Sequence, residues 1–262
     1  GVTHYMIDEW NPDEEFNVMI FQKHVKEIME DIYNRGKIPI LVGGTGFYIQ
    51  AVLNDIAFTK EKQGDEIRAD LQNLAKEKGA SYLHHELQKV DKESAEAIHP
   101  NNIKRVIRAL EYFQSTGQKF SDHNKEERQK GSPYNFLYLV LTMNRKVLYE
   151  RIDKRVDQMM EEGLVKEVKQ LLDAGYSRNL VSMQGLGYKE IASALFKECT
   201  MEEAVYRLKR DTRHFAKRQM TWFRRERDVT MINKDNFSNN HEIVNYIMKL
   251  AVEKGICSCR EG

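Results

Sequence analysis

Basic side chains are concentrated in one segment, and their chemistry suits a polyanion. Residues 207–227 contain nine Arg and Lys against Asp211 and Glu226, whereas the whole chain of 262 residues has a formal net charge of +1. The run from Lys217 to Arg225 also carries Trp222. Lys and Arg neutralise phosphates, and an aromatic ring can stack on an unpaired base. The segment therefore indicates an RNA-binding helix face, and a solvated basic face is the alternative.

A second candidate group surrounds Thr45. The apolar residues Ile38, Ile40, Leu41 and Val42 do not alternate with polar ones, which is typical of a strand buried on both faces of a parallel sheet. The glycine-rich stretch 43–46 follows, and the apolar spacing of residues 47–52 then suits a helix. This order would place Thr45 at the carboxyl end of a strand, where open α/β sheets bind ligands. The spacing alone favours a plain tight turn that needs glycine.

Isolated cations form a third group. Arg155 follows Arg151 by one helical turn, beside an apolar stripe between Leu148 and Met159. An arginine near a core either binds an anion or pairs with a carboxylate, and the candidate partners are Glu150, Asp153 and Asp157. Three further cations, Lys104, Arg105 and Arg108, lie on the polar side of an expected helix and suggest ordinary surface charge.

Composition limits the remaining possibilities. The histidines show no metal-ligand spacing, so no metal ligands are assigned. Three cysteines without a paired framework favour a reducing, cytoplasmic setting. No apolar run is long enough to span a membrane, and no signal peptide is recognisable.

The elements that must position these residues predict an α/β fold. A second fully buried strand is expected over Phe136–Thr142, and a long helix over Met201–Glu226. Residues 55–129 are charged, helical and poor in strand signals, with a polar loop expected over 123–131. We therefore predict a parallel-sheet core flanked by helices in residues 1–54 and 130–262, interrupted by a mostly helical insertion domain in residues 55–129.

Several segments, taken together, resemble the tRNA dimethylallyltransferase (tRNA isopentenyltransferase) family. They occur in family order along nearly all of the chain to about residue 230, and six such segments in order are specific although each is weak alone. The segments are His4–Asp8 with Asn11–Asp13, Ile38–Tyr48, Ile98–Arg108, Arg151–Arg155, Ser182–Lys189 and Ala216–Arg224.

The resemblance implies a P-loop-type α/β core and a transfer reaction. The family moves a dimethylallyl group from dimethylallyl diphosphate to N6 of the adenosine 3′ of the tRNA anticodon, after that base is flipped out of the loop. Backbone N–H groups, Mg²⁺ accompanying the diphosphate and cations would stabilise the leaving group. The expected partners are the tRNA anticodon stem-loop and dimethylallyl diphosphate. We expect a monomer and no membrane partner.

Residue roles follow from the same resemblance. Arg155 matches the arginine beside the reacting centre, to which we assign diphosphate stabilisation, and Thr45 matches a residue near the target adenine. The remaining matches would hold the anticodon stem-loop: Arg68, Lys104, Arg105, Arg108, Gln184, Gly185, Gly187, Tyr188, Lys189, Lys217, Arg218, Gln219, Thr221, Trp222 and Arg224.

One family segment has no match here. The chain contains no GxxxxGK[ST] motif. We therefore expect the family's P-loop and its general-base aspartate to lie outside this chain, and a polypeptide without them to have almost no catalysis. Two alternatives remain: an enzyme that prenylates free adenine nucleotides, and a non-catalytic tRNA-binding fragment. The basic helix and the 184–189 loop favour a tRNA enzyme, because a free nucleotide does not need them.

Overall fold

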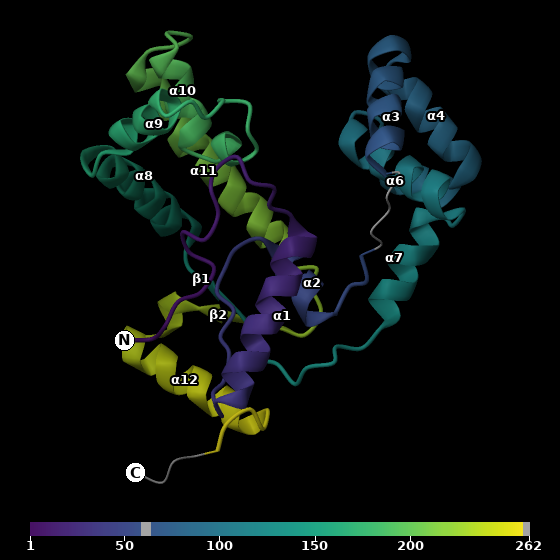
Figure 1. Ribbon diagram of the computed structural model, residues 1–262. Helices are drawn as coiled ribbons and strands as arrows, with labels where there is room; N and C mark the ends of the chain where they lie inside the picture. The colour runs from purple at the N-terminus through teal and green to yellow at the C-terminus, as the bar shows by residue number, and fades with distance from the viewer. Residues whose placement is uncertain (59–63, 259–262) are drawn as a thin grey trace. The chain divides into compact units, whose positions relative to one another are not determined.

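The computed structural model describes residues 1–58 and 64–258. Its chain forms two compact units, residues 1–49 with 134–262 and residues 50–133 (Figure 1). The insertion predicted over residues 55–129 therefore corresponds to a unit whose ends lie within five residues of the predicted ones. Each unit has its own buried apolar cluster.

The first unit contains a small parallel sheet. Strand β1 (Tyr138–Thr142) pairs with β2 (Val229–Asn233), with Tyr138 opposite Val229 and Thr142 opposite Asn233 (Figure 1). The strand predicted over 136–142 is thus present from Tyr138 onward. The prediction that it is buried on both faces is wrong, because Leu141 is 53% exposed. Strand β2 was not predicted.

The strand predicted over Ile38–Val42 is absent. These residues have no regular secondary structure, and Ile40 and Val42 are 80% and 87% exposed. A strand needs a neighbour to receive its backbone N–H and C=O groups. Within residues 1–58 and 64–258, β1 and β2 pair only with each other, so this apolar run has no strand beside it.

Helices make up most of the first unit. Asn17 caps α1 (Val18–Asn34), and Asn144 caps α8 (Arg145–Glu161), its Oδ1 accepting the Lys146 N–H at 2.9 Å. The others are α9 (Leu164–Asp173), the short η1 (Ser182–Gln184), α10 (Tyr188–Leu195), α11 (Met201–Phe223), η2 (Lys234–Asn236) and α12 (Asn240–Glu253). α11 ends at Phe223, three residues earlier than predicted. Helix α2 (Gly46–Leu53) lies at the boundary of the two units in sequence.

One core joins α8, α9, α10 and α11. Val156, Val168, Ile191 and Leu208, one from each helix, are at most 2% exposed and belong to the same apolar cluster. Burying four such side chains contributes roughly 1.5–3 kcal/mol each. This cluster fixes the helices that carry most of the candidate site residues.

The second unit is helical in its described residues. Its helices are α3 (Gly64–Lys78), α4 (Ala80–Val90), α5 (Lys92–Ala97), α6 (Ile103–Thr116) and α7 (Phe120–Gln129). Leu71, Leu83, Leu87 and Val106 lie in its apolar cluster. The loop predicted over residues 123–131 is wrong because α7 extends to Gln129. Its Glu, Lys and Gln residues are good helix formers even without an apolar stripe.

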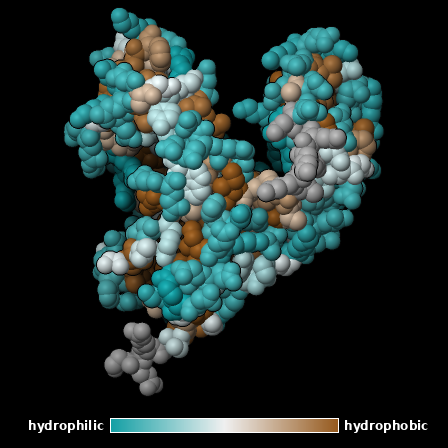
Figure 2. Space-filling model, in the orientation of Figure 1, coloured by the Kyte–Doolittle hydropathy of each residue, from teal (hydrophilic) through white to brown (hydrophobic). Residues whose placement is uncertain are grey.

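Hydrophilic residues cover much of the visible surface of each unit, with hydrophobic residues among them (Figure 2). None of the helices in the described part of the chain is long and apolar enough to cross a membrane.

Candidate functional site

The amino-terminal half of the basic helix is neutralised by carboxylates. On α11, Arg207 pairs with Glu203, and Arg210 pairs with Asp211 at 2.8 Å. Two further pairs cross to α8: Lys209 Nζ lies 2.5 Å from Asp157, and Arg213 lies 2.5 Å from Asp153. These four pairs compensate the charge of this half of the helix.

The cations from Lys217 to Arg224, at the carboxyl-terminal end of α11 and just after it, keep their charge. Lys217, Arg218 and Arg224 are exposed, and no carboxylate in residues 1–58 or 64–258 forms an ion pair with them. Arg218 lies 5.8 Å from the ring centroid of Phe215, and the Thr221 hydroxyl bonds back to the Lys217 carbonyl at 3.0 Å. The uncompensated cations of the chain's basic segment are therefore concentrated at one end of the helix.

The glycine loop packs on this same end. Gln219 Nε2 donates to the Gly44 carbonyl at 2.9 Å. A Cβ at Gly46 would lie 2.2 Å from the Trp222 ring, closer than any side chain can approach, so glycine is required there. The structure thus brings together two predicted groups, the Thr45 loop and the segment from Lys217 to Arg224, that are far apart in sequence.

Thr45 lies at the start of a helix, although no strand precedes it. It is exposed, and its carbonyl accepts the N–H groups of Tyr48 and Ile49 at 3.0 and 3.3 Å. The first N–H groups of a helix have no partner inside the helix and favour anions. The position of Thr45 therefore still suits a ligand, because Thr45 precedes the first N–H groups of a helix and not because it follows a strand.

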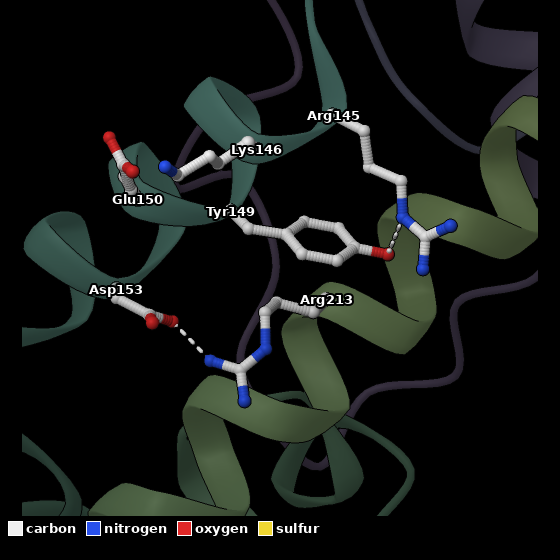
Figure 3. Close-up of a pocket in the computed structure, with 6 residues that line it drawn as sticks. All are labelled: Arg145, Lys146, Tyr149, Glu150, Asp153 and Arg213. Carbon is white, nitrogen blue, oxygen red and sulfur yellow. Dashed lines mark hydrogen bonds and ion pairs between the residues drawn. The ribbon is translucent and has the colours of Figure 1, made fainter.

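Arg155 is exposed on α8 and forms no hydrogen bond or ion pair with the described residues. Two of the three carboxylates expected to pair with it are engaged elsewhere, since Asp153 and Asp157 bind α11. A pocket of about 620 Å³ lies nearby between α8 and α11 (Figure 3). Its lining includes Arg145, whose Nε bonds to the Tyr149 hydroxyl at 3.1 Å, but not Arg155.

The predicted 184–189 segment forms a tight turn before α10. Gln184 Nε2 donates to the Arg178 carbonyl at 2.7 Å. The next residue, Gly185, has an extended backbone conformation. Gly187 has φ of 100°, and its N–H donates to Glu190 Oε2 at 2.8 Å. This bond from the Gly187 N–H to the Glu190 side chain caps the start of α10.

Tyr188 and Lys189 extend from this turn toward acidic groups. The Tyr188 hydroxyl donates to Glu167, and burial together with this bond raises the pKa of Tyr188 to about 12. Lys189 Nζ lies 3.4 Å from Glu190 Oε1. Both side chains therefore have partners within the protein.

The insertion-domain cations separate into two kinds. The guanidinium of Arg68 binds both carboxylate oxygens of Glu111, at 2.8 and 3.2 Å, and Arg108 binds the same carboxylate at 3.1 Å. The Glu111 side chain is only 2% exposed, so Arg68 and Arg108 stabilise a buried charge. Lys104 and Arg105 are exposed and lack such a partner among the described residues.

Two glutamates at the site were missed from the sequence. Glu111 follows Arg108 by three residues on one helix face, and Glu190 follows Gly187 by three, the spacing of a capping box. Both spacings were visible, but neither reveals how deeply the carboxylate is buried.

The described residues contain no cluster of three or more His, Cys, Asp or Glu that could hold a metal ion. These residues thus do not form a metal cage of their own.

The fold and the site define an α/β protein with an exposed cationic end of a helix beside a glycine loop, an arrangement suited to a polyanion. A family model described as IPP transferase matches residues 1–226. The chain belongs to this family, which confirms the family predicted from the sequence. The comparisons do not confirm the expectation that the family's P-loop unit lies outside the chain.

Individual proteins that are similar to this chain carry names that agree with this family. A tRNA dimethylallyltransferase of Lachnoclostridium phytofermentans is 56% identical over 256 residues, covering 98% of this chain and 82% of the relative. The tRNA isopentenylpyrophosphate transferase structure of Bacillus halodurans is 42% identical with a TM-score of 0.68. The match covers 97% of this chain and 80% of that one. The structure of a eukaryotic dimethylallyltransferase acting on tRNA is 27% identical with a TM-score of 0.77. The match covers 95% of this chain and 66% of that one. These likenesses also confirm the predicted fold class.

Proposed function

We propose that this chain transfers a dimethylallyl group from dimethylallyl diphosphate to N6 of the adenosine 3′ of the tRNA anticodon. N6 attacks C1 of the donor, the bond from C1 to the diphosphate oxygen breaks with its electrons leaving on diphosphate, and N6 releases one proton. Enzymes named for this transfer are up to 56% identical to the chain over most of its length. The chain is accordingly a tRNA-modifying prenyltransferase.

The observation that carries the substrate assignment is the charge distribution along α11. Four cations of its amino-terminal half are paired with carboxylates, whereas Lys217, Arg218 and Arg224 are exposed and not ion-paired with described residues. Unpaired cations favour phosphate binding, because binding releases counterions without breaking a salt bridge. The Thr45 loop packs beside them, so the adenine and the phosphates of one RNA could be bound together.

Arg155 is the proposed partner of the leaving diphosphate. It is exposed and not paired with a described carboxylate, so its five N–H donors are available to an anion. We assign Thr45 to the target adenine. Gln184 to Lys189 and the exposed Lys104 and Arg105 would contact the stem-loop. Mg²⁺ would arrive with the diphosphate, which usually supplies most of its ligands in such sites.

The test measures dimethylallyl transfer to an anticodon stem-loop RNA. Reversing both Lys217 and Arg218 to Glu should abolish transfer, and Arg155→Ala should lower turnover roughly 100-fold or more while leaving RNA affinity unchanged. Reversing the exposed Lys166 and Lys249 changes the net charge equally and should have little effect. A chelator should stop the reaction if Mg²⁺ accompanies the donor.

Each alternative has its own outcome. If the chain binds RNA with steep salt dependence but transfers nothing, it is a tRNA-binding protein. If it transfers the group to adenosine monophosphate and this activity survives the Lys217 and Arg218 reversals, it is a free-nucleotide enzyme. The proposal also includes a monomeric, cytoplasmic protein, which light scattering and cell fractionation would test.

A further inference from the structure

The pocket between α8 and α11 has no part in the function proposed above. It has a volume of about 620 Å³, which is within the range of small-ligand sites (Figure 3). Five of its lining residues come from the first turns of α8 and one from α11: Arg145, Lys146, Tyr149, Glu150, Asp153 and Arg213. Because five of these six side chains are charged, the pocket favours a charged ligand.

Arg145 is a cation of this lining with free donors. Its Nε donates to the Tyr149 hydroxyl at 3.1 Å, and its guanidinium lies 5.1 Å from the centroid of the same ring. It forms no ion pair with a carboxylate in residues 1–58 or 64–258. Both Nη groups of Arg145 therefore remain for an anion, and the contacts with Tyr149 already hold the guanidinium in place.

The carboxylates of the lining do not neutralise this arginine. Asp153 binds Nη1 of Arg213 at 2.5 Å, which leaves the other N–H groups of Arg213 for a second acceptor. Figure 3 shows the Glu150 carboxylate on the side of Lys146, pointing away from Arg145. The part of the pocket between Arg145 and Arg213 is therefore positively charged and lined by N–H donors.

The pocket lies level with a cation that the proposed function assigns to RNA. Asp153 pairs with Arg213, and a second pair one turn away joins the same two helices in the opposite order of residue numbers, so α8 and α11 run antiparallel. Extending this register by one turn toward the start of α8 brings Lys217 level with Tyr149. Lys217 and Arg213 also share a face of α11, because they are four residues apart. An RNA strand bound to Lys217 would therefore pass beside the pocket.

We propose that this pocket binds a backbone phosphate of the anticodon stem-loop RNA. The two Nη groups of Arg145 donate to its oxygens as a pair, which is the geometry that a guanidinium offers to phosphate. The Tyr149 hydroxyl donates its own proton, and Arg213 contributes the donors that Asp153 does not use. The inference rests on the proposed function, which brings RNA to Lys217, and it extends the RNA-binding surface from α11 to the first turns of α8.

Two substitutions of Arg145 separate its charge from its place in the fold. Arg145→Gln removes the charge, whereas Arg145→Lys keeps the charge but not the paired Nη groups. Helix α8 should form in both, since Gln and Lys are good helix formers and the Asn144 cap bonds to a backbone N–H. Lys154→Gln is the matched control, because Lys154 is exposed on α8, is not ion-paired with described residues and does not line the pocket.

The first experiment measures the affinity of the full chain for an anticodon stem-loop RNA at several salt concentrations. Arg145→Gln should weaken binding about tenfold and lower the slope of log K against log salt by about 1, because one phosphate contact is lost. Arg145→Lys should keep most of the slope, and Lys154→Gln should match the wild type in both quantities. A slope that Arg145→Gln leaves unchanged, or equal losses in Arg145→Gln and Lys154→Gln, would overturn the pocket assignment and leave the proposed function intact.

The second experiment locates the phosphate. Stem-loop RNAs that each carry one uncharged methylphosphonate are bound to the wild type, to Lys154→Gln and to Arg145→Gln. In the first two proteins, one position should weaken binding several-fold, and in Arg145→Gln the same position should have no further effect because its partner is already removed. If every position affects Arg145→Gln as it affects the wild type, Arg145 does not bind an RNA phosphate.

Two other outcomes concern the source of the phosphate. If Arg145→Gln loses binding of inorganic diphosphate but keeps the wild-type affinity and salt slope for RNA, the pocket binds a small phosphate ligand and the RNA assignment is wrong. If the wild type does not bind the stem-loop RNA, the proposed function is rejected together with this inference.

Discussion

Asp153 on α8 and Arg213 on α11 form an ion pair of 2.5 Å, and Asp157 and Lys209 repeat it one helical turn away (Figure 3 shows the first pair). The two acids are four residues apart on α8, and the two bases are four apart on α11 in the opposite order, so the helices run antiparallel in register. Both carboxylates are thereby removed from Arg155, which leaves that arginine for an anion.

These pairs should contribute modestly to stability. Asp153 and Arg213 have side chains 39% and 24% exposed, so solvent screens their attraction. A double-mutant cycle with Asp153→Asn and Arg213→Gln should give a coupling free energy of about 0.5–1 kcal/mol in denaturant unfolding. Strictly additive single effects would show that the pair does not hold the two helices together.

Replacing Gly46 by Ala should disturb Trp222. The added Cβ would lie 2.2 Å from the indole ring, so the ring must move and about 1–3 kcal/mol of stability should be lost. Trp222 fluorescence, recorded in a Trp10→Phe background, should change in position or intensity. Gly43→Ala is the control, because a Cβ there meets nothing within 4 Å. If Gly46→Ala and Gly43→Ala gave the same Trp222 fluorescence spectrum, Gly46 would not lie against the indole ring as the structure places it.

Removing the charge of Glu111 should weaken the insertion unit. This carboxylate is 2% exposed and binds both Arg68 and Arg108. Glu111→Gln replaces the carboxylate that binds both arginines with a neutral amide, so their positive charges are no longer compensated. We expect a loss of roughly 2–3 kcal/mol in the free energy of unfolding. The pair of Glu86 and Lys89, in which solvent reaches both side chains, provides the comparison, since Glu86→Gln should cost much less stability than Glu111→Gln. Similar losses in the two variants would contradict this account.

Local patterns in the sequence predicted the features that depend on local interactions. The apolar stripe between Leu148 and Met159 located the helix that buries Val156, and the charged, strand-poor composition of residues 55–129 predicted helices there. The run Ile38–Val42 was misread because a strand depends on a neighbour elsewhere in the chain. Strand β2 was missed for the same reason, since its partner Tyr138 lies about ninety residues before Val229.

The candidate site shows the same division. The types of residue were visible in the sequence, as the basic segment and the glycine loop show. Which cations remain unpaired was not visible, because Asp153 and Asp157 reach them from another helix. The bond between Gln219 and Gly44 likewise joins residues 175 apart in sequence. Such pairings follow from packing and not from spacing.

Asp91 makes the stability of the insertion unit depend on acid pH. It is 1% exposed and accepts hydrogen bonds from Ser94 N–H at 3.0 Å, Ser94 hydroxyl at 2.6 Å and Ser121 N–H at 2.8 Å. Burial alone would raise the pKa of Asp91, but these bonds outweigh it, so its pKa lies below the ordinary value of 3.8. A carboxyl with a lowered folded pKa contributes stability that is complete above the unfolded pKa and is lost as the pH falls through the folded value.

The Asp91 contribution should therefore be complete above about pH 5 and decline below about pH 4. Asp91→Asn should lower the free energy of unfolding by about 1–3 kcal/mol at pH 7, because a neutral amide cannot accept all three bonds. The difference between wild type and variant should shrink as the pH falls toward 2. Denaturant unfolding followed at several pH values would measure it, with the exposed Asp70→Asn on α3 as control. A difference that stays constant with pH would show that the charge of Asp91 does not stabilise this unit.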